Sequence, residues 1–291
     1  MGRWPILASV VAAALAGAAR AAEPGWTACR IAQGVLVVPA QAAGLTGAFV
    51  LDTAAARSTL DATQASLAGL DSQGAVVPVR LGGRRLARVD MAIAALDART
   101  QDQPTPITGV LGVDVLKGRV LEVEPDPCRF RLTAHAAPQR NLASLPLDLI
   151  GGVPYVRAGV SDGASARRGV FRMATGGAPA VRLSPAVARL EGAPAGSAGL
   201  TAPLRALSLG GLLIEQPLAA IAAQAEPGVS GDIGEPVWAA YGLSLDLRRR
   251  RLTLYAPPPQ LAFSPCGGRR GPWRSHGRMR GCAPLTILSS R

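Results

Sequence analysis

An internal repeat constrains the fold of this chain more than any other feature of its sequence. Gly47-Ala-Phe-Val-Leu-Asp-Thr-Ala-Ala-Ala56 matches Gly169-Val-Phe-Arg-Met-Ala-Thr-Gly-Gly-Ala178, and Gly109-Val-Leu-Gly112 matches Gly231-Asp-Ile-Gly234, both at a spacing of 122 residues. Four matches in one register predict a duplicated structural unit. The other two matches at this spacing are Leu121-Glu-Val-Glu124 with Leu243-Ser-Leu-Asp246, and Arg129-Phe-Arg-Leu132 with Arg251-Leu-Thr-Leu254.

Each unit has the pattern of a β-rich lobe. Short apolar stretches such as Val76–Leu81 end at Gly-Gly turns, and the 34 glycines and 24 prolines favour turns and short strands over long helices. Helical patterns are brief, and Asp61–Leu70 and Ser184–Leu190 each begin with a capping residue. We therefore expect a first lobe over residues 23–140 and a second lobe over residues 141–257.

The two ends of the chain lie outside the repeat. Residues 1–22 resemble a signal peptide, with Arg3 as a positive start, an apolar Ile6–Ala19 and an A-x-A cleavage site at Ala19-Arg20-Ala21. The alternative is an uncleaved anchor, but the apolar stretch is short for a bilayer span. We expect a secreted or periplasmic protein with no stable membrane span after cleavage. Residues 258–291, rich in Pro, Gly and Arg, are expected to form a flexible tail.

The four cysteines are interpreted as disulfide partners, because an exported chain enters an oxidising compartment. Three pairings are possible. Cys29 opens the first strand-like stretch and Cys128 opens the last strand of the first lobe, while Cys266 and Cys282 both lie in the tail. We therefore favour Cys29–Cys128 together with Cys266–Cys282. No metal site is expected, since the chain has no C-x-x-C and its two histidines are isolated.

The net charge of +12 does not by itself indicate nucleic acid binding. The cationic residues are scattered arginines, apart from Arg248–Arg251, the tail and the single lysine Lys117, whereas a nucleic-acid face needs basic residues clustered with aromatic ones. The sequence also lacks a G-x-S-x-G elbow, a Walker loop and a dinucleotide-binding fingerprint. We expect neither a nucleic acid partner nor a cofactor.

The repeated motifs resemble those of a known family. Phe49-Val-Leu-Asp-Thr-Ala-Ala-Ala-Arg-Ser58, followed by Ile107-Thr-Gly-Val-Leu-Gly-Val-Asp-Val-Leu116, is similar to the aspartic proteases, above all to the retropepsin-like lobes of exported bacterial members. Such lobes occur singly or as pepsin-like tandem pairs, and Phe171–Gly177 with Gly231–Trp238 supplies the second copy here. The resemblance implies a mainly β fold of two tandem retropepsin-like (acid protease) β-barrel lobes with a few short helices.

The resemblance also implies a catalytic site. In this family two aspartates share one proton about a water molecule, so that one carboxylate activates the water and the other protonates the peptide carbonyl. It assigns the catalytic carboxylate to Asp52. The supporting loops would be Thr53, Ala54, Ala174, Thr175 and Gly176, and the strands beneath them would carry Gly109, Gly112, Gly231 and Gly234.

Two positions depart from the family pattern. Ala54 stands where glycine is usual, a change that some retroviral-type enzymes tolerate. Ala174 stands where the second aspartate belongs, so Asp52 would face a methyl group. A second carboxylate would have to come from Asp52 of another copy or from a residue such as Asp232, the one acid introduced at a motif position. The alternative role for Asp232 is to cap the turn into Glu235-Pro236.

Three functions follow from these residues. The first is an aspartic endopeptidase centred on Asp52, acting on peptide or unfolded protein. The second is an inactive pseudoprotease that binds extended peptide between the lobes, because Ala174 replaces the second aspartate. The third is an interaction protein whose cleft has no ligand. Leu81-Gly-Gly83 fits either a flap or an ordinary hairpin turn, and Trp238 fits the core. The sequence predicts no particular oligomeric state.

Overall fold

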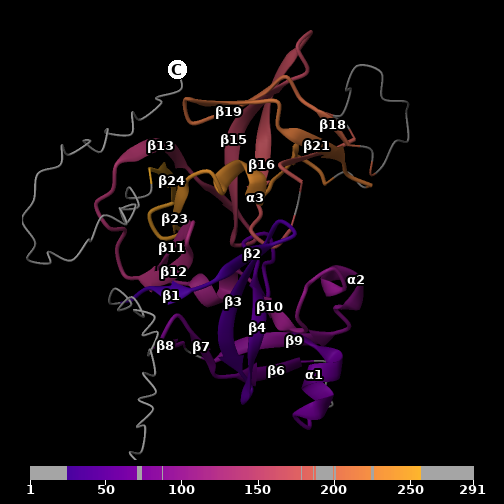
Figure 1. The fold of residues 1–291 in the computed structure, drawn as a ribbon, viewed down its shortest axis with the longest axis vertical. Helices are drawn as coiled ribbons and strands as arrows, with labels where there is room; N and C mark the ends of the chain where they lie inside the picture. Colours follow the sequence, from indigo (N-terminus) through magenta and orange to yellow (C-terminus); the bar gives the residue numbers. More distant parts are fainter. Residues whose placement is uncertain are drawn as a thin grey trace, which may run out of the picture. The chain divides into compact units, whose positions relative to one another are not determined.

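A computed structural model describes residues 25–256 except 71–73, 87, 178, 186, 188–198, 200 and 224–225. Its strands form two nine-stranded sheets and one six-stranded sheet (Figure 1). The predicted duplicated, mainly β architecture is therefore confirmed. The predicted signal peptide, the tail and the Cys266–Cys282 pair lie outside the described residues. Within the described part, no helix is long and apolar enough to cross a membrane.

The first lobe contains one nine-stranded sheet in the order β6-β9-β5-β10-β4-β3-β7-β8, with β2 paired to β3. Parallel pairing of β4 with β10 places the ends of two motif strands side by side. The strands are β2 (Arg30–Ala32), β3 (Val35–Ala42), β4 (Leu45–Leu51), β5 (Thr59–Asp61), β6 (Gly74–Val77), β7 (Val79–Leu81), β8 (Arg84–Arg85), β9 (Val89–Ala94) and β10 (Ile107–Leu111).

The second lobe repeats this sheet strand for strand, in the order β18-β21-β17-β22-β16-β15-β19-β20, with β14 paired to β15. Parallel pairing of β16 with β22 corresponds to that of β4 with β10. The strands are β14 (Asp148–Ile150), β15 (Val153–Ser161), β16 (Ala166–Met173), β17 (Val181–Leu183), β18 (Thr201–Pro203), β19 (Ala206–Leu209), β20 (Leu212–Glu215), β21 (Leu218–Ile221) and β22 (Gly231–Ile233).

The helices are short. Asp61 caps α1 (Ala62–Leu67) by accepting a hydrogen bond from Gln64 N at 3.1 Å. The helix expected over Ser184–Leu190 falls largely outside the described residues. The remaining helices are α2 (Asp97–Thr100), the 3-10 helix η1 (Val113–Leu116) and α3 (Glu235–Trp238), and η1 and α3 follow the motif strands of the two lobes at equivalent places.

The repeat extends further toward the N-terminus than a single spacing reveals. β2 and β3 begin 118 residues before β14 and β15, whereas β4 ends 122 residues before β16. The hairpin between β15 and β16 accounts for this difference, because both of its strands and its turn are longer than those of the first lobe. A search at one constant spacing therefore misses these strands.

A third sheet takes its strands from both halves of the chain, in the order β1-β12-β11-β23-β24-β13. In the central antiparallel pair, Leu121 lies opposite Leu245 and Glu122 lies opposite Ser244. Because Glu122 and Ser244 are themselves repeat counterparts, a pseudo-twofold axis passes between them. The strands are β1 (Thr27–Ala28), β11 (Val120–Pro125), β12 (Cys128–Thr133), β13 (Asn141–Pro146), β23 (Gly242–Asp246) and β24 (Arg251–Tyr255).

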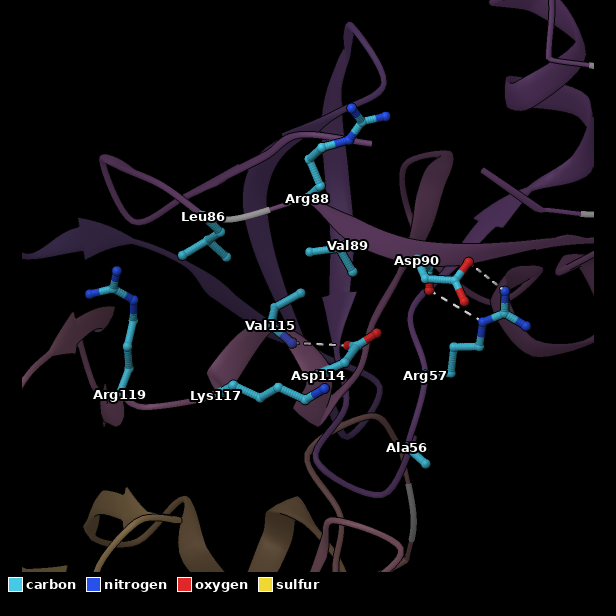
Figure 2. A pocket seen from close by; sticks show the side chains of 10 residues that line it. All are labelled: Ala56, Arg57, Leu86, Arg88, Val89, Asp90, Asp114, Val115, Lys117 and Arg119. Carbon is cyan, nitrogen blue, oxygen red and sulfur yellow. Dashed lines mark hydrogen bonds and ion pairs between the residues drawn. The ribbon is translucent and has the colours of Figure 1, made fainter. Parts of the chain in front are cut away.

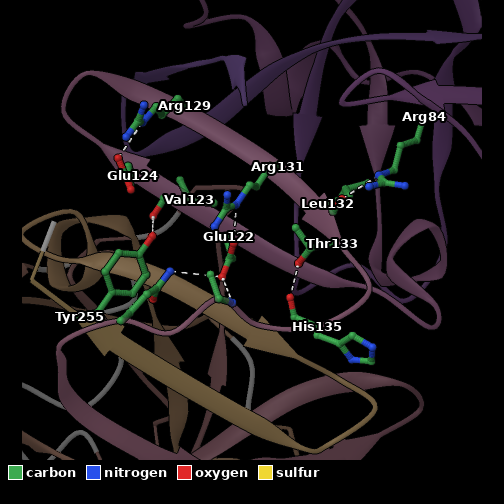
Figure 3. A network of polar contacts seen from close by, with 12 residues as sticks. Arg84, Glu122, Val123, Glu124, Arg129, Arg131, Leu132, Thr133, His135 and Tyr255 are labelled. Atoms are coloured by element: carbon green, nitrogen blue, oxygen red, sulfur yellow. Dashed lines mark hydrogen bonds and ion pairs between the residues drawn. The ribbon is translucent and has the colours of Figure 1, made fainter. Parts of the chain in front are cut away.

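Charged residues are buried on this shared sheet with their partners (Figure 3). Glu122 is fully buried; its carboxylate accepts hydrogen bonds from Arg131 Nε, from Ala137 N at 2.9 Å and from Gln139 Nε2 at 3.2 Å. Arg131 also lies 4.4 Å from the centroid of the Trp26 ring, a cation–π distance. The network therefore fastens the segment before β1 and the segment after β12 to the sheet.

The predicted Cys29–Cys128 disulfide is present, with the two Cα atoms 5.0 Å apart. Cys29 N also donates a hydrogen bond to Cys128 O at 3.0 Å. The bond joins the segment between β1 and β2 to the start of β12, at a sequence separation of 99 residues. It therefore closes almost the whole first lobe into one covalent loop.

Candidate active-site cavity between two pseudo-symmetric loops

Asp52 lies directly after β4, at the edge where β4 and β10 run parallel. Its backbone N–H donates to Leu111 O at 2.8 Å, and its carboxylate accepts from Ala54 N at 2.8 Å. Gly109 allows β10 to lie close to β5, since a Cβ there would lie 2.6 Å from Thr59 O. The side chain is 3% exposed. Backbone geometry, rather than a flexible side chain, thus sets the position of this carboxylate.

Residues 112–114, which follow β10, hold the Asp52 loop in place through hydrogen bonds. Ser58 donates from its N–H and its hydroxyl to the two carboxylate oxygens of Asp114, at 2.8 and 2.6 Å. Gly112 N donates to Ser58 Oγ at 3.0 Å, and Val113 N donates to Ala55 O at 2.8 Å. A side chain at Gly112 would lie 2.6 Å from that same Ala55 oxygen, so the loop and the strand end can meet only at glycine.

Ala174 occupies the corresponding place in the second lobe, after β16. Its N–H donates to Ile233 O at 3.0 Å, which is the repeat equivalent of the bond from Asp52 to Leu111. Trp238, fully buried in α3 as expected of a core residue, donates from Nε1 to Ala174 O at 3.3 Å. The second lobe therefore keeps the backbone that would present an aspartate, but it presents a methyl group.

Two threonines join the lobes across the pseudo-twofold axis. Thr53 Oγ1 donates to Met173 O at 2.6 Å, and Thr175 Oγ1 donates to Leu51 O at 2.6 Å. Thr175 Oγ1 also accepts a hydrogen bond from Thr53 N at 3.0 Å. Both threonines are 1% exposed. The exchange brings the two predicted loops together within one chain, so an Asp52 from another copy could not enter without displacing the second lobe.

We expect Thr175→Val to destabilise the protein more than Thr53→Val. Thr175→Val removes the hydrogen bonds to Leu51 O and from Thr53 N, and should lower the free energy of unfolding by about 2–3 kcal/mol. Thr53→Val removes only the hydrogen bond to Met173 O, and should lower it by about half as much. Urea unfolding of the two isosteric variants measures the difference. Equal losses would show that the acceptor role of Thr175 is unimportant.

The two loops are not hydrogen-bonded to the opposite lobe in the same way. Gly176 forms a β-bridge with Val35, and Leu36 N donates to Thr175 O at 2.8 Å. In the second lobe the residue equivalent to Leu36 is Pro154, which has no N–H to donate to the first loop. The loop of the second lobe is therefore clamped onto the first lobe by a hydrogen bond that its counterpart lacks.

A cavity of about 640 Å³ lies between the loops and is lined by residues of both lobes. Asp52, Ala54, Ala174 and Gly176 contribute from the loops, while Asp102 and Gln103 contribute from the connection between α2 and β10. Gln103 Nε2 donates to Ala32 O at 3.3 Å. The predicted loop residues therefore form one wall of the cavity. Another part of the lining comes from a first-lobe connection that no sequence motif predicted.

Asp232 lines the same cavity, as a charge partner of two arginines. Its carboxylate, 4% exposed, accepts from Arg172 Nε at 2.9 Å and from an amino group of Arg182 at 3.1 Å. The interpretation as a turn cap is wrong, since α3 begins after Gly234 without a side-chain capping bond. Each carboxylate oxygen of Asp232 therefore accepts a hydrogen bond from a different guanidinium group, which holds the carboxylate as an ion-pair partner.

The arginines extend this network outward from the cavity. Arg172 also donates to Glu226 at 3.2 Å, and Tyr155 OH donates to the other oxygen of Glu226 at 3.1 Å. Burial, followed by the charge of Glu226, raises the pKa of Tyr155. In the repeat alignment Arg172 stands where the first lobe has the buried Val50. A charged residue at a position that is apolar in the other copy is the sequence signal that could have identified Arg172 as a cavity residue.

The Gly82-Gly83 turn is an ordinary hairpin turn and not a flap. A Cβ on Gly82 would lie 3.3 Å from the ring of Phe130, which belongs to the shared sheet. Arg84 Nε reinforces this placement by donating to Leu132 O at 2.7 Å. The turn thus packs on β12, and it is not among the residues that line the cavity.

A second cavity, of about 470 Å³, lies entirely within the first lobe (Figure 2). Figure 2 shows Arg57 paired with Asp90 at one side, at 2.8 Å between charged atoms, and Lys117 below Val115. Arg57 and Asp90 are both more than half exposed, so their ion pair contributes little to stability. The residues that line this cavity all belong to the first lobe, and they do not include Asp52.

Comparison with known proteins shows similarity of fold. No family model matches the sequence, and no curated protein matches it. Among solved structures, the chain is similar to the aspartic proteinase from Irpex lacteus, with a TM-score of 0.51 and 12% identity over 80% of this chain and 97% of that one. The fold is therefore the two-lobed, pepsin-like arrangement expected from the repeated motifs.

Proposed function

We propose that this chain binds an extended polypeptide segment in the cavity between its lobes and does not hydrolyse it. One observation carries the proposal: the position that mirrors Asp52 holds the methyl group of Ala174. Hydrolysis by this fold needs a base to activate water and an acid to protonate the carbonyl oxygen, and one carboxylate cannot do both at once. Asp232, the other buried acid of the cavity, is bound by two arginines.

The cavity suits a peptide in size and in chemistry. Its volume of about 640 Å³ is within the usual range for ligand sites, roughly 300–1,000 Å³. Small residues at 54, 174 and 176 allow a main chain to approach, and the Asp52 carboxylate is an acceptor for its N–H groups. The resemblance of the motifs to aspartic proteases, together with the fold shared with an aspartic proteinase, supports the choice of polypeptide as the ligand.

The test separates binding from cleavage. Wild-type protein incubated with reduced, alkylated casein between pH 3 and pH 7 should leave the casein intact by mass spectrometry, whereas fluorescent casein peptides should bind it by polarisation. Asp52→Asn keeps the shape but removes the charge, and should weaken binding by about tenfold. Asp90→Asn, in the exposed ion pair with Arg57, is the matched control and should bind as wild type.

A second candidate is slow hydrolysis with Asp52 and Asp232 as the two acids, favoured by their presence in one cavity. Casein cleavage that is lost in both Asp52→Asn and Asp232→Asn would establish it and overturn the first proposal. An intact substrate together with no peptide binding would instead indicate an interaction protein whose cleft is empty.

We further propose that the protein acts outside the cytoplasm. The signal-like residues 1–22 and the Cys29–Cys128 disulfide both support export to an oxidising compartment. Fractionation of the native host, with detection of the mature N-terminus, tests this localisation.

A further inference from the structure

We infer that the methyl group of Ala54 excludes an aspartate from position 174, so that two residues, and not one, keep the site from becoming a two-carboxylate centre. This inference deepens the proposed function and rests on it. It assigns Ala54 a positioning role that the sequence comparison, which treats Ala54 as a tolerated variant, does not reveal.

The first step is the contact between Gly176 and Asp52. A Cβ placed on Gly176 would lie 2.3 Å from Asp52 Cβ, 2.2 Å from Asp52 Cγ and 2.6 Å from Asp52 Oδ2. Atoms this close overlap. Rotating the Asp52 side chain cannot relieve the overlap between a Cβ on residue 176 and the Cβ of Asp52, because the Cβ of Asp52 is bonded directly to the backbone. At the spacing of the two loops in this chain, Asp52 therefore requires a glycine at position 176.

The second step applies the pseudo-twofold axis. The bond from Asp52 N to Leu111 O recurs as Ala174 N to Ile233 O, and the two threonines exchange equivalent bonds across the axis. This symmetry relates Gly176 to Ala54 and Asp52 to Ala174. By this relation, the Cβ of Ala54 is expected to face the space that the carboxylate of an aspartate at position 174 would need.

The third step explains how the present pair fits. Exact symmetry would bring even the Cβ atoms of Ala54 and Ala174 into overlap, so the two loops depart from exact symmetry at these positions. Pro154 agrees with such a departure, because it cannot form the hydrogen bond by which Leu36 holds the opposite loop. A departure that fits one methyl group against another leaves less room for an aspartate, which adds three more heavy atoms.

The experiment is a two-by-two set of full-length variants: wild type, Ala54→Gly, Ala174→Asp, and the double variant Ala54→Gly/Ala174→Asp. Each is incubated at pH 4 with reduced, alkylated casein, with and without pepstatin. We expect pepstatin-sensitive cleavage at least a hundredfold above background in the double variant alone. Adding Asp52→Asn to the double variant should abolish it, and Ala54→Gly by itself should stay inactive.

Thermal unfolding keeps the inference testable if a buried carboxylate proves inactive. Steric exclusion predicts that Ala174→Asp lowers the Tm by several degrees more in the wild-type background than in the Ala54→Gly background. Equal Tm losses in both backgrounds, or equal cleavage by the single and double variants, would overturn the inference. Cleavage by the wild type would overturn the proposed function instead, so the two failures are distinguishable.

Discussion

Gly176→Ala should strongly weaken peptide binding and lower the free energy of unfolding by about 3 kcal/mol, at the upper end for overpacking a buried site. The added Cβ would overlap Asp52 Cβ at 2.3 Å, so the two loops must separate. Separation breaks the threonine exchange and moves Asp52 away from the cavity wall. Peptide affinity, measured by fluorescence polarisation, should fall by about a hundredfold or more, as for other central anchors.

Gly159→Ala is the matched control for this change. Gly159 lies in β15 of the same lobe, and a Cβ there would meet its nearest neighbours at 3.8 Å, an ordinary contact. Its stability and peptide affinity should stay close to those of the wild type. If Gly176→Ala behaves like this control, the close approach between Gly176 and Asp52 does not exist in solution.

Removing the Cys29–Cys128 disulfide should cause the largest loss of stability. The bond closes a loop of about 99 residues, and the chain-entropy relation gives about 4–5 kcal/mol for a loop of this length. The bond also crosses from the segment before β2 to the start of β12, so its loss loosens the shared sheet. Urea unfolding of Cys29→Ser/Cys128→Ser against wild type measures the change.

The two tail cysteines provide the control. Cys266→Ser/Cys282→Ser should unfold at the same urea concentration as the wild type. Reduction with dithiothreitol should destabilise the wild type and this variant equally. The Cys29→Ser/Cys128→Ser variant should be insensitive to dithiothreitol. If dithiothreitol lowers its stability as much as that of the wild type, the stabilising disulfide involves other cysteines.

Features that repeat locally were predictable from the sequence. The motif strands follow from patterns within short segments, because strand and turn signals are local. The Cys29–Cys128 pair was predictable although its residues lie 99 apart, because the repeat places both cysteines in one lobe and the other two in the tail. The same reasoning predicts Trp238 as a core residue. These elements agree with the structure since each is specified by its own few residues.

Features that depend on pairing between distant segments were not predictable. The shared sheet requires the register of β11 against β23, which no local pattern encodes. Arg172 and Arg182 pair with Asp232 because β16 and β17 lie on either side of β22 in the sheet and place both arginines directly opposite the acid, whereas sequence reasoning treated it as a turn residue. Asp102 and Gln103 line the cavity from a connection without any motif.

The Glu122–Ser244 pair at the pseudo-twofold axis has a consequence for how the two halves can assemble. A homodimer of the first half would place Glu122 directly opposite its own copy, and like charges in that position repel each other. In this chain Ser244 occupies that place instead, so the buried hydrogen bonds of Glu122 form without an opposing charge. The central pair of the sheet therefore favours two unlike halves in one polypeptide over two identical copies of the first half.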